Sequence, residues 1–217
     1  MRGFSATVKS SVISRLVLGA ALLAAACALS PAPARAGEEV PPVSSMLDGA
    51  VTYTLPEGWH IVMYINTIWS GAAEVHDTKD PKATSPALLF LTAGVLREKK
   101  TVGEMGADNY GSHMRRQMEG TVLSDKADSE EWRTVVSTIV QRGVPYLMLE
   151  HFGVVDNKYA EVVVSIRLGS GDVEGMKKGV ADFNAVCESI KVNGRGNFEN
   201  RVSPDIIKEQ LKVNARK

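Results

Sequence analysis

The sequence predicts an α+β fold in which a mainly antiparallel sheet is flanked by helices. Two observations predict it. Three β-rich runs between residues 133 and 168 are separated by turns of a few residues, which cannot join parallel strands. A later segment carries apolar residues at helical spacing, and it can bury that stripe only against a sheet.

Residues 1–36 are typical of a cleavable signal peptide. A basic start without acids precedes an apolar run over residues 16–29, whose 14 residues are too few to cross a bilayer that needs about 20. The small residues of Ala34-Arg35-Ala36 then predict cleavage before Gly37. We therefore expect the mature protein to be exported and to be periplasmic or secreted.

Cys27 offers an alternative end to this segment, a lipid anchor. A lipoprotein signal usually has Leu three positions before its Cys, but Ala24 stands there and Leu23 is one position too far. The site at residues 34–36 competes with it. We expect cleavage before Gly37, whereas lipidation of Cys27 would tether the protein to a membrane.

The charge of the mature chain is unevenly placed. Residues 37–190 contain 14 Lys and Arg against 22 Asp and Glu, a net charge of −8. Residues 191–217 contain 7 against 3, a net charge of +4. An acidic body with a basic tail argues against nucleic acid as a partner. One cysteine, Cys187, follows the predicted cleavage site, and its place on an apolar helical stripe predicts burial.

The first half of the chain is expected to begin with an irregular lead-in over residues 37–49. Strands follow at residues 51–54 and 59–65, because β-branched and aromatic residues flank a turn at Pro56-Glu57-Gly58. Residues 70–86 contain Gly, Asp and Pro and predict a loop. The apolar run at residues 87–95 predicts a central strand.

A first helix is predicted over residues 101–119. Thr101 and Glu104 form a capping-box pattern at its start, and Gly120 ends it. Its apolar side chains share one face and predict packing against the core rather than a binding surface. They are Met105, Tyr110, Met114 and Met118.

The second half is expected to contain strands at residues 133–141, 145–155 and 159–168. A second helix follows, with Asp172 as its N-cap, and its apolar stripe predicts burial against the sheet. The stripe contains Val173, Met176, Val180, Phe183, Val186 and Ile190. Residues 193–197 predict a flexible linker, and Ser203-Pro204-Asp205 predicts the start of a short, weakly docked tail helix. We expect residues 193–217 to be dispensable for folding and to contribute to partner or surface binding. The alternative is that Ile206, Ile207 and Leu211 dock on the acidic body and complete its core.

Catalytic motifs with a recognisable spacing are absent from the sequence. The histidines at positions 60, 76, 113 and 151 are dispersed, and adjacent strand positions place Glu150 and His151 on opposite faces. One local constellation is a candidate metal site, since carboxylates and an imidazole within one loop could bind a divalent cation. It consists of Glu74, His76, Asp77 and Asp80. A hydrated loop has the same composition. We expect no other cofactor.

The order of these segments resembles the PsbP-like superfamily over residues 50–192. The likeness rests on five stretches: Tyr53-x-Leu55-Pro56-x-Gly58-Trp59, the capped helix, Arg142-Gly143-x-Pro145, Tyr159-x-x-Val162-Val163-Val164, and Phe183-x-x-x-Cys187-x-Ser189-Ile190-Lys191. That superfamily includes an extrinsic photosystem II subunit, an envelope lipoprotein and a Ran-binding import factor. The resemblance implies an α/β/α sandwich and a non-enzymatic role, with Trp59 and Phe183 in the core. It carries over no functional residue.

Two functions therefore stand side by side. One is an exported, non-enzymatic accessory protein that binds a protein partner in the cell envelope. The other is a small-ligand or metal-binding periplasmic protein, or a hydrolase with dispersed residues, which would use the 70–86 loop and the histidines.

Overall fold

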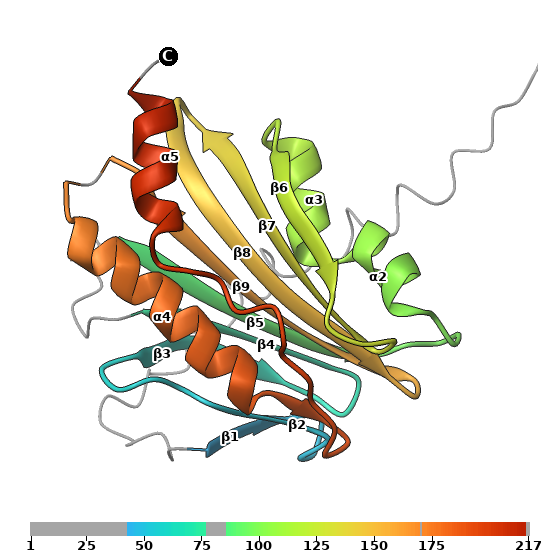
Figure 1. Cartoon of the computed structure of the whole chain (residues 1–217). Helices are drawn as coiled ribbons and strands as arrows, with labels where there is room; N and C mark the ends of the chain where they lie inside the picture. Colours follow the sequence, from blue (N-terminus) through green and yellow to red (C-terminus); the bar gives the residue numbers. More distant parts are fainter. Residues whose placement is uncertain (1–42, 77–85, 170, 216–217) are drawn as a thin grey trace, which may run out of the picture. The chain divides into compact units, whose positions relative to one another are not determined.

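The computed structural model describes residues 43–76, 86–169 and 171–215, all within the unit Val40–Lys217. In these residues, seven strands form an antiparallel sheet in the order β3-β4-β5-β9-β8-β7-β6 (Figure 1). Its strands are β3 (His60–Asn66), β4 (Ser70–His76), β5 (Ala87–Val95), β6 (Thr121–Ala127), β7 (Trp132–Gln141), β8 (Val144–Val155) and β9 (Lys158–Arg167). A smaller sheet has the order β1-β2-β10, with β1 (Val43–Met46), β2 (Val51–Thr54) and β10 (Lys191–Val192). The mixed α+β class is confirmed.

The described helices are α2 (Val102–Asp108), α3 (Tyr110–Gln117), α4 (Val173–Ser189) and α5 (Ile206–Asn214). Among the described residues, none of them combines the length and apolar character needed to cross a bilayer. The predicted caps are present, because the capping box joins Thr101 and Glu104, and the Asp172 side chain accepts the Gly175 N–H.

The predicted meander is formed by β7, β8 and β9. Two tight turns join these strands, and Arg142, Gly143 and Asp156 in them have φ values of 51°, 77° and 58°. This left-handed backbone is what short hairpin turns between twisted strands require. The apolar strand β5 lies between β4 and β9, as expected of a central strand.

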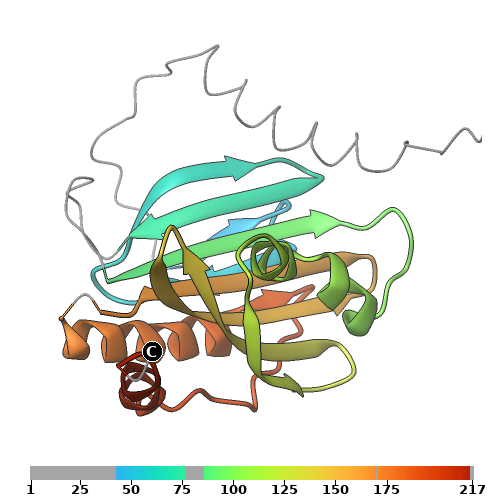
Figure 2. The same ribbon diagram turned by 90° about the horizontal axis from the view of Figure 1, so that it is seen from above.

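Helices pack on both faces of the larger sheet (Figure 2). On one face, Phe183 of α4 is fully buried in a cluster with Leu149 of β8 and Val164 of β9. On the other face, Val102 at the start of α2 packs with Val135 and Phe152. Successive residues of β8 therefore point into two different layers. The predicted burial of Phe183, Trp59 and Cys187 is confirmed.

The loop predicted over residues 70–86 is wrong in its first part. Ser70–His76 form β4, which pairs with β3 and β5. A Cβ on Gly71 would lie 2.8 Å from the Met46 sulfur, so glycine permits a close approach to β1. Pairing on both sides outweighs the low strand propensity of Gly and Ala. Residues 77–85 lie outside the described residues.

Two further strands correct the sequence prediction. Val43–Met46 form β1 within the segment expected to be irregular, because they pair with β2 and bury Met46. Thr121–Ala127 form β6, an edge strand whose mostly exposed side chains alternate too weakly to predict it. Strand pairing, rather than local composition, makes both segments regular.

The helix expected over residues 101–119 is broken at Asn109, whose extended backbone ends α2 and begins α3. Its side chain accepts the Ser112 N–H and donates to Glu150. The N–H groups of Tyr110 and Gly111 then donate to the buried Glu161 carboxylate, at 3.1 and 2.9 Å. The carboxylates of Glu150 and Glu161 on the sheet thus bind the start of α3. These contacts account for the break between α2 and α3.

The tail differs most from expectation. Ile207 is fully buried and Val202 is 7% exposed, both within the main core cluster. The Asn184 amide binds the backbone N–H and C=O of Val202 at 3.1 and 2.9 Å. The linker is fixed as well, because Arg195 forms ion pairs with Glu131 and Asp156. The prediction of a weakly docked tail counted only the apolar residues of α5, whereas the extended residues before α5 also complete the core.

Candidate functional site

The sequence-predicted metal candidate is only partly described. Glu74 and His76 lie two residues apart on β4, and His76 Nε2 is 2.8 Å from Glu74 Oε1. Asp77 and Asp80 lie outside the described residues. Among residues 43–76, 86–169 and 171–215, no three His, Cys, Asp or Glu side chains gather so that they could hold a metal ion. The structure therefore shows a hydrogen-bonded pair, and the four-residue site stays a prediction.

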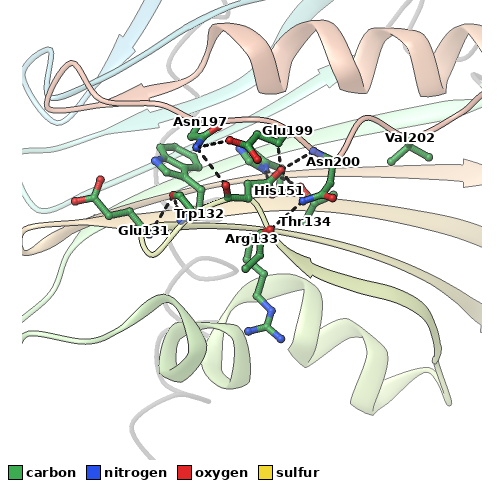
Figure 3. Close-up of polar contacts among 12 residues, drawn as sticks. Glu131, Trp132, Arg133, Thr134, His151, Asn197, Glu199, Asn200 and Val202 are labelled. Carbon is green, nitrogen blue, oxygen red and sulfur yellow. Dashed lines mark hydrogen bonds and ion pairs between the residues drawn. The ribbon is translucent and has the colours of Figure 1, made fainter.

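A buried carboxylate, Asp128, is the centre of a polar network that we call the Asp128 cluster: Asp128, Thr134, His151, Glu199 and Asn200. Figure 3 labels Thr134, His151, Glu199 and Asn200 of this cluster. Asp128 lies in the turn between β6 and β7. Its Oδ2 accepts a hydrogen bond from the Thr134 hydroxyl at 2.6 Å. Its Oδ1 accepts the backbone N–H groups of Glu199 at 2.8 Å and Asn200 at 2.7 Å. One carboxylate thus joins the C-terminal segment to the sheet.

The imidazole of His151 lies beneath this carboxylate. Its Nδ1 is 3.0 Å from Thr134 Oγ1, and the hydroxyl proton already goes to Asp128, so Nδ1 is the donor. The ring stacks on Trp132 with centroids 4.9 Å apart and meets the edge of Phe198 at 5.0 Å. Within the described part of the chain, His151 Nε2 and Trp132 Nε1 are buried without a hydrogen-bond partner.

Burial and hydrogen bonding shift the pKa values of Asp128 and His151. Burial alone would raise the pKa of the Asp128 carboxyl, but donors from His151, Thr134 and two backbone N–H groups hold that pKa well below its usual range. Burial lowers the pKa of His151, and the Asp128 carboxylate offsets this only in part. At neutral pH the carboxylate is therefore charged and the imidazole neutral.

An Asp–His pair also orients the general base of many hydrolases. Such a base needs a nucleophile within hydrogen-bond reach of its free nitrogen, and His151 Nε2 has none among the described residues. Two surface cavities flank the cluster, of about 270 and 480 Å³. Thr134 lines the first and Trp132 the second, but Asp128 and His151 line neither. The geometry is that of a structural tie between the tail and the sheet.

Two buried carboxylates on the opposite face, Glu150 and Glu161, form a second polar cluster under α3. Glu150 forms an ion pair with Arg115. Burial raises the pKa of Glu161, and the N–H groups of Gly111 and Tyr110 oppose the rise. A Cβ on Gly111 would overlap the Glu150 carboxyl group, so α3 directly covers this pair. The carboxylates position a helix and are closed to a substrate.

The most exposed large apolar side chains of the described residues lie at the turn between β3 and β4. We call Ile68 and Trp69 the hairpin tip; they are 58% and 67% exposed. The turn is held in place, because Thr67 Oγ1 accepts the N–H groups of Trp69 and Ser70 and the Trp69 carbonyl accepts the Val95 N–H. Such a fixed, exposed tryptophan is typical of a protein-contact site.

Sequence reasoning found neither the Asp128 cluster nor the hairpin tip. Asp128, Thr134 and His151 have no motif spacing, and only strand pairing brings them together. The tip did leave a signal, since residues 58–73 contain no Asp, Glu, Lys or Arg. The β-branched and aromatic residues of 59–65 predict a strand but not its exposure, which follows from the position of β3 at the edge of the sheet.

No protein-family model and no curated protein matches the chain. Among solved structures, a crystal structure of a protein from Bacteroides thetaiotaomicron VPI-5482 is similar over 68% of this chain and 46% of that chain. The TM-score is 0.36 and the sequence identity 11%. The chain thus spans about half the length of that protein. A similarity of this size assigns neither a family nor a function.

Proposed function

We propose that this chain is an exported, non-enzymatic accessory protein that acts through protein–protein contacts in the cell envelope. The observation that carries the proposal is the hairpin tip, where Trp69 is 67% exposed on a turn fixed by Thr67. Tryptophan contributes strongly to binding when a partner covers it. A single exposed apolar residue needs no explanation, but two adjacent ones on a rigid turn favour a contact site.

The proposal includes a finer view of the fold. The layers formed by α4 on one face and by α2 and α3 on the other would be the outer layers of an α/β/α sandwich of the PsbP-like kind. Asp128, His151, Glu150 and Glu161, the ionisable groups at the centres of the two polar clusters, line neither of the two cavities, and both clusters tie segments of the chain together. This supports a binding role over a reaction.

The experiment places a photo-crosslinking residue at position 68 of the full chain, expressed in its native host. We expect a discrete cross-linked species that is lost when Trp69→Ser is added. The matched control is Val140→Ser, which alters a residue of similar exposure, 51%, at the end of β7. The proposal fails if Trp69→Ser leaves the cross-link unchanged, or if Val140→Ser removes it to the same extent.

A further inference from the structure

Strand β3 is one edge of the larger sheet, and its outer backbone groups are unpaired in the described residues. The Thr67 N–H donates to the Ser70 carbonyl, so the groups of Thr67 point toward β4. Backbone direction alternates along a strand, so Ile65 and Met63 also face β4, opposite Ala72 and Glu74. The N–H and C=O groups of Tyr64 and Asn66 therefore point outward. Within residues 43–76, 86–169 and 171–215, neither residue forms a backbone–backbone hydrogen bond on that side.

This edge lacks the protection that edge strands usually have. Charged side chains and proline deter edge-to-edge pairing, and residues 58–73 contain no Asp, Glu, Lys, Arg or Pro. A bulge between Ile61 and Met63 distorts only the first part of the strand. The opposite edge, β6, carries Lys126 and the Asp125–Arg133 ion pair. The two edges of one sheet are thus protected unequally.

The exposed area is large enough for a specific contact. Val62, Tyr64 and Ile65 on this strand are 47%, 45% and 39% exposed. The neighbouring hairpin tip adds Ile68 and Trp69, which are 58% and 67% exposed. Together with the backbone of a seven-residue strand and the neighbouring turn, the edge approaches the lower range of a stable interface, on the order of 600–800 Å² per partner.

We infer that the occupant of this edge is a second copy of the chain, which pairs its own β3 antiparallel to this one about a two-fold axis. Within the described residues, this uncharged edge presents unpaired backbone groups that another strand can pair with, and a second copy presents an identical edge. Placing Tyr64 of one copy opposite Tyr64 of the other aligns two identical uncharged strands without like-charge repulsion. The two seven-stranded sheets then continue as one. With Tyr64 opposite Tyr64, the hairpin tip of one copy lies near the start of β3 in the other, so this inference rests on the proposed function and names a second copy as the partner of that site.

The test measures the mass of the full chain in solution by sedimentation velocity from about 1 to 100 µM. We expect a dimer for the wild-type chain. In Tyr64→Lys, two like charges meet at the axis, and the dissociation constant should rise at least about 100-fold. Tyr64→Glu should act in the same way. A one-to-one mixture of the two variants should regain the dimer, since Lys and Glu then face each other.

The control Val213→Lys changes an equally exposed residue on α5, 47% exposed, and should stay dimeric. If the charged variants unfold, Tyr64→Cys tests the same contact without adding a charge. With a short bis-maleimide linker it should form a covalent dimer, and Val213→Cys should not. The inference is overturned by a wild-type monomer at 100 µM, by a dimer that Tyr64→Lys leaves intact, or by a mixture that stays monomeric. A monomer that still cross-links from position 68 would overturn this inference alone and leave the proposed function standing.

Discussion

Replacing Asp128 with asparagine tests whether the Asp128 cluster holds the C-terminal segment on the sheet. The wild-type carboxylate accepts one hydroxyl and two backbone N–H groups at 2.6–2.8 Å. Hydrogen bonds to a charged group contribute about 1.5–3 kcal/mol each and are not additive. Asparagine keeps one oxygen for the backbone donors and loses the charge. We expect the free energy of unfolding to fall by about 2–4 kcal/mol in urea titrations at pH 7.

The pH dependence of this difference gives a sharper assay. The pKa of Asp128 is lower in the folded protein than in the unfolded chain, so its stabilisation is present above the unfolded value of about 4 and is lost as pH falls below it. The wild-type and Asp128→Asn proteins should therefore converge in stability between about pH 5 and pH 2. Asp125→Asn, in an exposed ion pair with Arg133, is the control and should cost under about 1 kcal/mol. A constant difference at all pH values, or a loss as small as that of the control, would refute the reasoning.

Three further predictions concern the packing, and a fourth concerns the signal peptide. Truncation after Val192 removes Ile207 and the two backbone donors to Asp128, so the shortened chain should lose cooperative thermal unfolding; a melting temperature equal to that of the full chain would contradict this. Phe183→Ala should cost about 3–5 kcal/mol in urea unfolding, and a loss under about 1 kcal/mol would place Phe183 outside the core. The wild-type protein should lose stability as pH falls below about 6.5, because the pKa of His151 is lowered on folding, and His151→Phe should remove that slope; an unchanged slope would assign it to another group. Intact-mass measurement of exported protein should give an N-terminus at Gly37, and a lipid-modified Cys27 would contradict it.

The sequence predicts the fold best where local chemistry and tertiary packing agree. The Asp156 turn and the caps at Thr101 and Asp172 act over a few residues, so they are visible in a short window. Strand β4 is the opposite case, because its Gly and Ala are regular only through pairing on both sides. The break at Asn109 is equally hidden, since the carboxylate that binds Tyr110 N–H lies 51 residues away.

The candidate sites, like the fold, are visible in the sequence only where they depend on neighbouring residues. Residues 58–73 show their lack of charge in the sequence, but the exposure of Trp69 depends on which strand ends the sheet. The Asp128 cluster joins β7, β8 and the tail, and His151 looks like any other dispersed histidine until β8 pairs with β7. The tail prediction erred for a related reason, because it weighed apolar residues by number and ignored the backbone donors that a buried carboxylate requires.

The distance in sequence between Asp128 and its donors has a consequence for how the protein is made. Glu199 and Asn200 lie 71 and 72 residues after Asp128, so they leave the ribosome long after the sheet strands. Until then the Trp132–His151 stack lacks its covering Phe198, and the carboxylate lacks its backbone donors. Chains whose synthesis stops early thus expose aromatic surface next to an unsatisfied charge, the condition in which partly folded chains aggregate or are degraded. The same three residues, 198–200, therefore cover the aromatic stack and supply the backbone donors that the buried carboxylate needs.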